Sequence, residues 1–99
     1  MIHVIAIITA HPGKRTALLE LFQAVVPVVR EEKGCIEYGV AVDVRNADPA
    51  FGADTYVVVE KWENLETLKA HSVAPHMQAF GAAAKNLIAK RAVHVLEPA

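Results

Sequence analysis

The chain has 99 residues, of which 54% are hydrophobic, and its formal net charge is −1 with the five histidines neutral. A chain this short has apolar volume for one core, so we expect a single domain over residues 1–99. The near-zero charge creates no basic field for nucleic acid or anionic lipid, which argues against both partners. The single cysteine, Cys35, excludes an intrachain disulfide and a cysteine-only metal cluster.

The first predicted element is a strand over Ile2–Ala10, which is rich in β-branched residues and ends at the turn signal His11-Pro12-Gly13. Its residues are apolar at both odd and even positions, which point to opposite faces, so both faces of the strand should be covered. No basic segment precedes this strand, and its apolar run is too short to span a bilayer. We therefore expect a buried strand of a cytoplasmic protein.

The hydrophobic period changes over residues 14–32, which are predicted to form an amphipathic helix. Gly34 follows at the position of a left-handed helix cap. The apolar positions recur at three- and four-residue spacing: Leu18, Leu21, Phe22, Val25, Val28 and Val29.

Two strands are predicted next, over residues 35–44 and 55–63, joined by a polar loop over 45–54. In the first of them Ile36, Tyr38, Val40 and Val42 fall on one face. Asn64 can cap a short helix whose inner side carries Leu65, Leu68 and His71.

Pro75 separates this short helix from a second one with the apolar set Met77, Phe80, Ala84, Leu87 and Ile88, and residues 91–97 form the last predicted strand. The element order is thus β-α-β-β-α-β. Right-handed crossovers turn it into a ferredoxin-like α+β fold, a four-stranded antiparallel sheet with both helical segments on one face.

The other face of this sheet would carry Ile5, Ile7 and part of the run Val57-Val58-Val59 with no helix to cover it. A bare apolar face of this size is rare on a soluble monomer. We therefore expect a homodimer that buries the two sheet faces against each other, as a dimeric α+β barrel.

The segment from Glu60 to Met77 contains the pattern E-x-W, then eight residues, then H-x-x-x-P-H-M. This pattern resembles the signature of the antibiotic-biosynthesis-monooxygenase family, and in particular of the bacterial quinol monooxygenases. The resemblance extends over nearly the whole chain through Pro12-Gly13-Lys14, Val26-Pro27, the run from Glu31 to Tyr38 and the terminal Val95-Leu96-Glu97-Pro98.

The resemblance implies a monooxygenase that oxidises a hydroquinone or polyphenol with dioxygen and without a cofactor. The chemistry is coherent, because triplet dioxygen reacts with a closed-shell molecule only when that molecule donates one electron. A deprotonated hydroquinone is electron-rich enough to do so. The protein then has to supply a base and an apolar pocket.

The candidate catalytic residues are His71 and His76, since histidine accepts a proton near neutrality. On an unbroken helix they would lie about 140° apart, but Pro75 interrupts the helix and lets both reach one cavity. A purely structural role at the helix–helix corner is the alternative for both. Glu60, a carboxylate within an apolar strand, is the third candidate. It either orients a histidine or accepts a proton, or it forms a structural ion pair near Lys61 or with the dimer partner.

The aromatic residues Tyr38, Trp62 and Phe80 are predicted to bind substrate, with a role in the core as the alternative. Two histidines without a third residue at ligand spacing do not predict a metal site. No glycine-rich phosphate loop indicates a flavin or a nicotinamide. The haem-degrading branch of the family has an asparagine, a tryptophan and a histidine ligand where this chain has Ala6, His71 and Gly81. We therefore expect no cofactor.

Two other functions remain open. One is a non-catalytic dimeric module that binds a small aromatic molecule. The other is an isomerase of a small phosphorylated signal molecule, an activity found in one branch of the family. The isomerase would need cationic groups in the pocket, and the chain has no Lys or Arg between Ala70 and Ala84.

Overall fold

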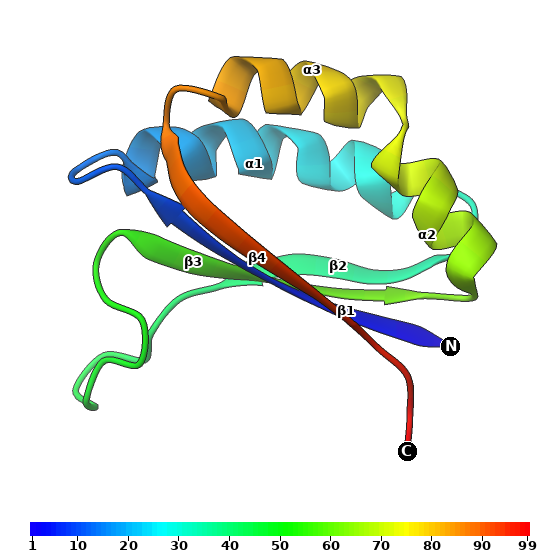
Figure 1. Cartoon of the computed structure of the whole chain (residues 1–99), viewed down its shortest axis with the longest axis horizontal. Helices are drawn as coiled ribbons and strands as arrows, with labels where there is room; N and C mark the ends of the chain where they lie inside the picture. Colours follow the sequence, from blue (N-terminus) through cyan, green and yellow to red (C-terminus); the bar gives the residue numbers. More distant parts are fainter.

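Three helices and four strands follow one another in the computed structural model, which describes all of residues 1–99 (Figure 1). In chain order they are β1 (Ile2–Ala10), α1 (Arg15–Arg30), β2 (Cys35–Ala41), β3 (Thr55–Trp62), α2 (Leu65–Ser72), α3 (Pro75–Ala84) and β4 (Ile88–Leu96). The predicted ferredoxin-like order is confirmed, with the second helical region divided into two helices just before Pro75. None of the three helices has the length and apolarity needed to cross a membrane.

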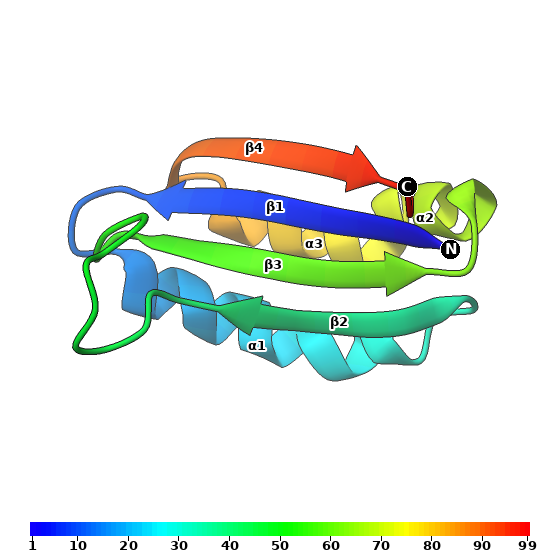
Figure 2. The ribbon, with the colours of Figure 1, turned by 90° about the horizontal axis from the view of Figure 1, so that it is seen from below.

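The four strands form one antiparallel sheet in the order β2-β3-β1-β4. The central strands β1 and β3 pair from Ile2 opposite Trp62 to Thr9 opposite Thr55. Seen from below, the sheet lies in front of the helices, and β2 and β4 form its two edges (Figure 2). Residues that alternate along β1 therefore point either toward the helices or away from them.

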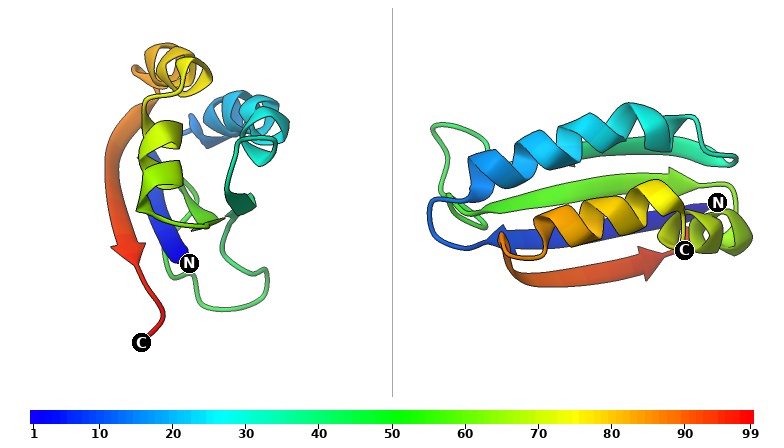
Figure 3. Two further views of the ribbon diagram at one scale, coloured as in Figure 1. Left: turned by 90° about the vertical axis from the view of Figure 1, so that its right-hand side faces the viewer. Right: turned by 90° about the horizontal axis from the view of Figure 1, so that it is seen from above.

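All three helices lie on one side of the sheet, as predicted, and the opposite side carries no helix (Figure 3). On β1 the buried residues alternate with half-buried ones, because the second set points to the uncovered side. Ile5 and Ile7 belong to this half-buried set, and their β3 partners Val59 and Val57 are also half-buried. The sheet thus has an apolar outer face, as the sequence analysis predicted.

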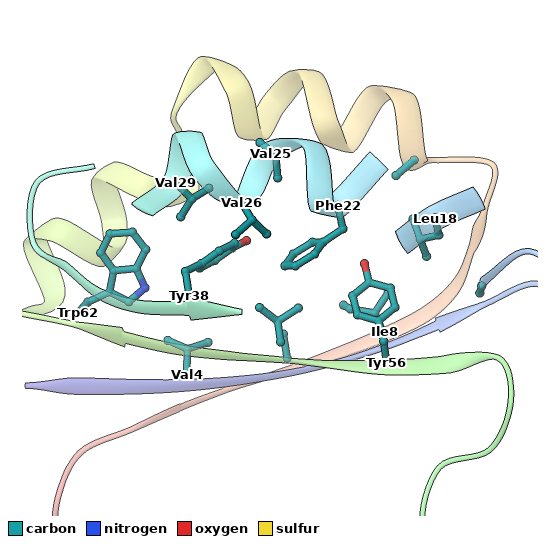
Figure 4. Close-up of a cluster of buried hydrophobic side chains, with 14 of the residues drawn as sticks. Val4, Ile8, Leu18, Phe22, Val25, Val26, Val29, Tyr38, Tyr56 and Trp62 are labelled. Carbon is teal, nitrogen blue, oxygen red and sulfur yellow. The ribbon is translucent and has the colours of Figure 1, made fainter. Parts of the chain in front are cut away.

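The core lies between the sheet and α1, where Phe22 is the central side chain (Figure 4). Its ring centroid lies 5.5 Å from those of Tyr38 and Tyr56 and 6.1 Å from that of Phe80. Aromatic pairs at this spacing add stability beyond the area that they bury. The core also holds Leu18, Val29 and Trp62, each with no exposed surface.

Three details differ from the predicted elements. β4 begins at Ile88, three residues earlier than predicted, because pairing with Ala10 across a register irregularity extends it. β2 ends at Ala41, and the alternating Val42 and Val44 that follow are exposed because no strand pairs with them. Leu65, predicted on the inner side of α2, is half exposed, since it lies in the first turn at the edge of the sheet.

Candidate active site

The short helix α2 is held at both its start and its side. Asn64 caps it as predicted: its Oδ1 accepts the Thr67 backbone N–H at 2.9 Å, and its own N–H is donated to the Thr67 hydroxyl at 3.4 Å. Gly34 packs against the same threonine, and a Cβ at this glycine would collide with the Thr67 side chain. The cap and the contact with Gly34 fix the position of α2 relative to the sheet, and with it the position of His71 on the inner face of the helix.

The turn after α1 places Glu32 directly beside this helix. The Glu32 N–H is donated to the Val29 carbonyl at 2.9 Å, and the Glu32 carbonyl accepts the Cys35 N–H at 3.1 Å. Gly34 adopts a φ of 82°, the left-handed conformation that favours glycine. Its carbonyl accepts the Glu63 N–H at 2.9 Å, which ties the turn to the end of β3.

The carboxylate of Glu32 joins the two candidate histidines. Its Oε2 lies 2.7 Å from Nδ1 of His71 and 2.9 Å from Nε2 of His76. One histidine comes from the end of α2 and the other from the start of α3, so the break just before Pro75 lets both reach one oxygen. Oε2 of an ionised carboxylate accepts from both rings, so each facing nitrogen carries a proton.

His71 is buried, with 5% of its surface exposed, and is held between two aromatic rings. Its centroid lies 4.7 Å from that of Trp62 and 5.3 Å from that of Tyr38. With the proton on Nδ1 held by Glu32, the lone pair of the neutral ring is on Nε2. This second nitrogen lies 4.0 Å from Oε1 of Glu60. The arrangement is that of a carboxylate-oriented histidine whose free nitrogen can accept a proton.

Glu60 extends inward from β3 with 7% of its surface exposed. Burial raises the pKa of this carboxyl, and two neighbours oppose the rise. The indole N–H of Trp62 is donated to its Oε1 at 2.9 Å, and His71 favours the ionised form. A carboxyl with a raised pKa beside a histidine is typical of functional sites.

His71 and Glu60 lie in the wall of a cavity of about 580 Å³ between the sheet and the helices. This volume suits a small organic ligand. Its wall is mainly apolar and includes Val4, Ala6, Ile8, Phe22, Val58, Met77, Phe80, Val93 and Val95. The polar and charged side chains of the wall are therefore the groups that would orient a ligand.

Two tyrosines of the wall have hydroxyls without a partner in the chain. Tyr38 is 3% exposed and Tyr56 is 1% exposed, and neither hydroxyl forms a hydrogen bond to another residue. Burial raises the pKa of both phenols, that of Tyr56 to about 12, so both stay protonated at neutral pH. Side-chain polar atoms shut off from solvent all have partners, so these two hydroxyls open onto the cavity.

The residues predicted for the site thus fall into two groups, those that line the cavity and those that do not. Four of them line the cavity: His71, Glu60, Tyr38 and Phe80. Trp62 and His76 lie behind that wall, where each contacts a wall residue or its carboxylate partner. Glu32 received no role from its sequence, although it lies in the run from Glu31 to Tyr38 that carried part of the family resemblance.

Glu32, His71 and His76 also form a set of three metal-ligating groups, with ligand atoms within 4.8 Å of one another. The expectation that the two histidines have no third ligand beside them is therefore wrong, because the fold brings Glu32 to both. Two histidines and one carboxylate suit a divalent transition metal ion. An ion bound there would take Nδ1 of His71 in place of the proton, on the side of the ring away from Glu60.

Comparison with known proteins gives the family. The model of the antibiotic biosynthesis monooxygenase family matches residues 1–83. The chain belongs to this family. It is 35% identical to a protein of Escherichia coli K12 named probable quinol monooxygenase YgiN, over 99% of this chain and 98% of that one.

Two solved structures share the fold over nearly their whole length. PA3566 from Pseudomonas aeruginosa superimposes with a TM-score of 0.84 at 26% identity, covering 99% of this chain and 93% of that one. Rv0793 from Mycobacterium tuberculosis superimposes with a TM-score of 0.83 at 29% identity, covering 99% of this chain and 94% of that one. The chain is thus a monooxygenase-family protein whose cavity sits where the fold brings the helices over the sheet.

The cavity wall also contains two cationic side chains. Lys85, directly after α3, and Arg91, on β4, both line the cavity. The sequence segment between Ala70 and Ala84 contains no cation, but the cavity wall extends beyond that segment. Its lack of cations therefore does not count against an anionic ligand.

Proposed function

We propose that the chain is a cofactor-independent monooxygenase that oxidises a hydroquinone or polyphenol with dioxygen. The observation that carries the proposal is the pair of Glu32 and His71 beside a mainly apolar cavity, since His71 lines this cavity and its Nε2 forms no hydrogen bond within the chain. The likeness to a probable quinol monooxygenase over the full chain supports the same activity.

In this mechanism Nε2 of His71 accepts the proton of a substrate hydroxyl. Glu32 stabilises the imidazolium that forms, because its carboxylate already accepts the Nδ1 proton at 2.7 Å. The neutral Tyr38 hydroxyl, which has no partner in the chain, is placed to donate to a substrate oxygen. Burial raises the pKa of Glu60, so this carboxyl takes up a proton more readily than an exposed one and can accept and return a proton beside His71.

The hydroquinone anion then transfers one electron to dioxygen, which gives a semiquinone and superoxide. These two radicals combine at a ring carbon, and the resulting hydroperoxide loses water. The overall reaction converts one hydroquinone and one dioxygen into one hydroxylated quinone and one water. The substrate supplies all the electrons, and the apolar wall keeps the reactive oxygen species away from bulk water.

An oxygen electrode tests the proposal with a panel of reduced quinones and polyphenols. We expect consumption of one dioxygen per product and incorporation of one ¹⁸O atom into the quinone. Activity should survive exhaustive chelation and should not track with a visible absorption band. A chain that consumes no oxygen with any member of the panel contradicts the proposal.

A second part of the proposal is the assembly. We propose that two copies pack through the uncovered sheet face, because Ile5, Ile7, Val57 and Val59 form an apolar surface there. Analytical ultracentrifugation at micromolar concentration should give a dimer. Ile7→Lys should shift it toward the monomer, because it would bury an unpaired ammonium. Val44→Lys, at a loop residue with 76% exposure, is the matched control.

One observation favours a second function. Lys85 and Arg91 in the cavity wall would suit a phosphorylated ligand, which the isomerase reading requires. A ribose phosphate that is rearranged without oxygen consumption would support the isomerase. Tight binding of aromatic ligands with no turnover at all would instead support the non-catalytic module.

A further inference from the structure

The cavity has two chemically different ends, separated along the strands. Glu60 and Tyr56 lie on the inner face of β3, four residues apart, which corresponds to about 13 Å of strand. Ile8 of β1 pairs with Tyr56 on one side and with Arg91 of β4 on the other. His71 and Glu60 therefore occupy one end, while Tyr56 and Arg91 occupy the opposite end.

The second end carries two cations without partners. Lys85 and Arg91 are both exposed at the edge of the cavity, and neither takes part in a salt bridge or side-chain hydrogen bond within the chain. Lys85 also follows the last turn of α3, where a cation is favoured by the helix dipole. Arg91 lies on a strand and has no such explanation.

No carboxylate of the cavity wall lies beside Lys85 and Arg91 to neutralise their positive charge. The only carboxylate of the wall is Glu60, at the other end. Unpaired cations beside apolar walls create a positive potential that concentrates anions. The guanidinium of Arg91 can form two parallel hydrogen bonds to a carboxylate, which adds orientation to the attraction.

Tyr56 is an independent sign that a ligand reaches this end. Its side chain is 1% exposed, yet its hydroxyl has no partner within the chain. Figure 4 shows this hydroxyl directed from β3 toward the helices, into the space beside Phe22. Because this hydroxyl opens onto the cavity, it is free to donate a hydrogen bond to a ligand oxygen at this end.

Resting on the proposed oxygenase function, we infer that the substrate is a two-ring phenol or hydroquinone that carries a carboxylate. Its reacting hydroxyl lies at His71, and its carboxylate lies among Tyr56, Lys85 and Arg91. A single unsubstituted ring would fill only part of a cavity of about 580 Å³ and could not reach both ends.

The apolar wall favours an aromatic acid over a phosphorylated sugar. Of the 19 residues that line the cavity, 13 are hydrophobic, so the hydroxyls of a sugar would lose water without gaining partners. A flat two-ring system instead packs between the aliphatic residues of the sheet and Phe22, Met77 and Phe80.

Binding is tested first, with a ligand pair that need not be oxidised. Calorimetry should show that 6-hydroxy-2-naphthoate binds at least about tenfold more tightly than its methyl ester, the effect of one charge-assisted hydrogen bond. The double variant Lys85→Gln/Arg91→Gln should reduce this preference to nearly one. Lys90→Gln, next to Arg91 but outside the cavity wall, should keep it.

Turnover is tested separately with a two-ring hydroquinone acid, 5,8-dihydroxy-2-naphthoate, and its methyl ester. We expect a higher kcat/KM for the acid and a loss of this preference in the double variant. Oxidation of both compounds with no preference would overturn the inference and leave the oxygenase function standing. If the chain binds 6-hydroxy-2-naphthoate more tightly than its methyl ester but oxidises neither hydroquinone, the oxygenase function is contradicted and the anion site is supported.

Two results overturn the anion site itself. One is equal affinity of the wild-type chain for the naphthoate and its ester. The other is a preference that survives in the double variant. Tighter binding of ribose 5-phosphate than of the naphthoate would overturn the aromatic acid as the ligand class.

Discussion

The two ends of the cavity differ in how their polar groups are satisfied. At one end Glu32, His71, Glu60 and Trp62 are held by hydrogen bonds and close packing within the chain. At the other end the Arg91 guanidinium is exposed and has no partner in the chain. Groups fixed in advance suit proton transfer, which depends on geometry, whereas unpaired groups suit recognition, because the ligand supplies the missing partners.

The largest effect should come from removing His71, the proposed base. We expect His71→Ala to lower hydroquinone oxidation by about 10² or more, a loss typical of a missing general base. Initial rates on an oxygen electrode measure it, and sedimentation should show an unchanged assembly. His11→Ala, at an exposed turn, is the matched control. Near-normal turnover of His71→Ala on every accepted substrate would make His71 structural.

The next effect should come from the residue that orients the base. Glu32→Gln keeps the shape of the side chain but removes the charge that stabilises the imidazolium, so we expect kcat to fall about tenfold with a smaller change in KM. Glu31→Gln, at the exposed neighbouring position, should leave both constants unchanged. Glu32→Asp should recover part of the loss if charge is the cause. Equal losses in the Glu31 and Glu32 variants would indicate a general effect on the turn.

The two tyrosines allow a direct comparison of the ends. Each Tyr→Phe change removes a hydroxyl and keeps the ring packing around Phe22. We expect Tyr38→Phe to lower kcat by about two- to tenfold, and Tyr56→Phe to raise KM for the acidic substrate by a similar factor, the effect of one neutral hydrogen bond. Steady-state kinetics separates the two constants. The reverse assignment of the two effects would contradict the proposed orientation of the substrate.

The smallest effect concerns stability at the base end. Because burial raises the pKa of Glu60 above its ordinary value of 4.5, the folded chain holds this proton more tightly than the unfolded chain. Stability therefore falls as pH rises through the interval between the two values. Glu60→Gln should remove this loss, so its melting temperature should exceed that of the wild type at neutral pH and approach it near pH 4. A constant difference across this range would contradict the linkage.

Much of the fold could be predicted from local patterns. The bounds of β1 were correct because Ile2–Ala10 is a continuous β-branched run that ends at Pro12-Gly13. The cap at Asn64 was correct because capping depends on residues three positions apart. The start of β4 was wrong by three residues, since Ile88 joins the strand only through its pairing with Ala10 across an irregular register.

The candidate site could be predicted only in part, for a related reason. His71 and Glu60 were identified because histidine and a carboxylate within an apolar strand are unusual locally. Glu32 was missed because it lies 39 residues from its partner His71 in an ordinary acidic turn. Lys85 and Arg91 were missed because they follow the segment between Ala70 and Ala84, and only the fold brings this later part of the chain to the cavity wall.

The sequence by itself determined the element order, the apolar character of both faces of β1 and the presence of histidines at a helix break. These properties depend on hydrophobic period and turn residues, which act over a few neighbours. Only the tertiary structure decided which groups meet. The crossover that brings the end of α1 beside α2 joins Glu32 to His71, and the pairing of β1 with β4 places Arg91 beside Ile8, at the end of the cavity away from His71. Contacts between residues distant in sequence follow from chain topology, and local patterns carry no information about them.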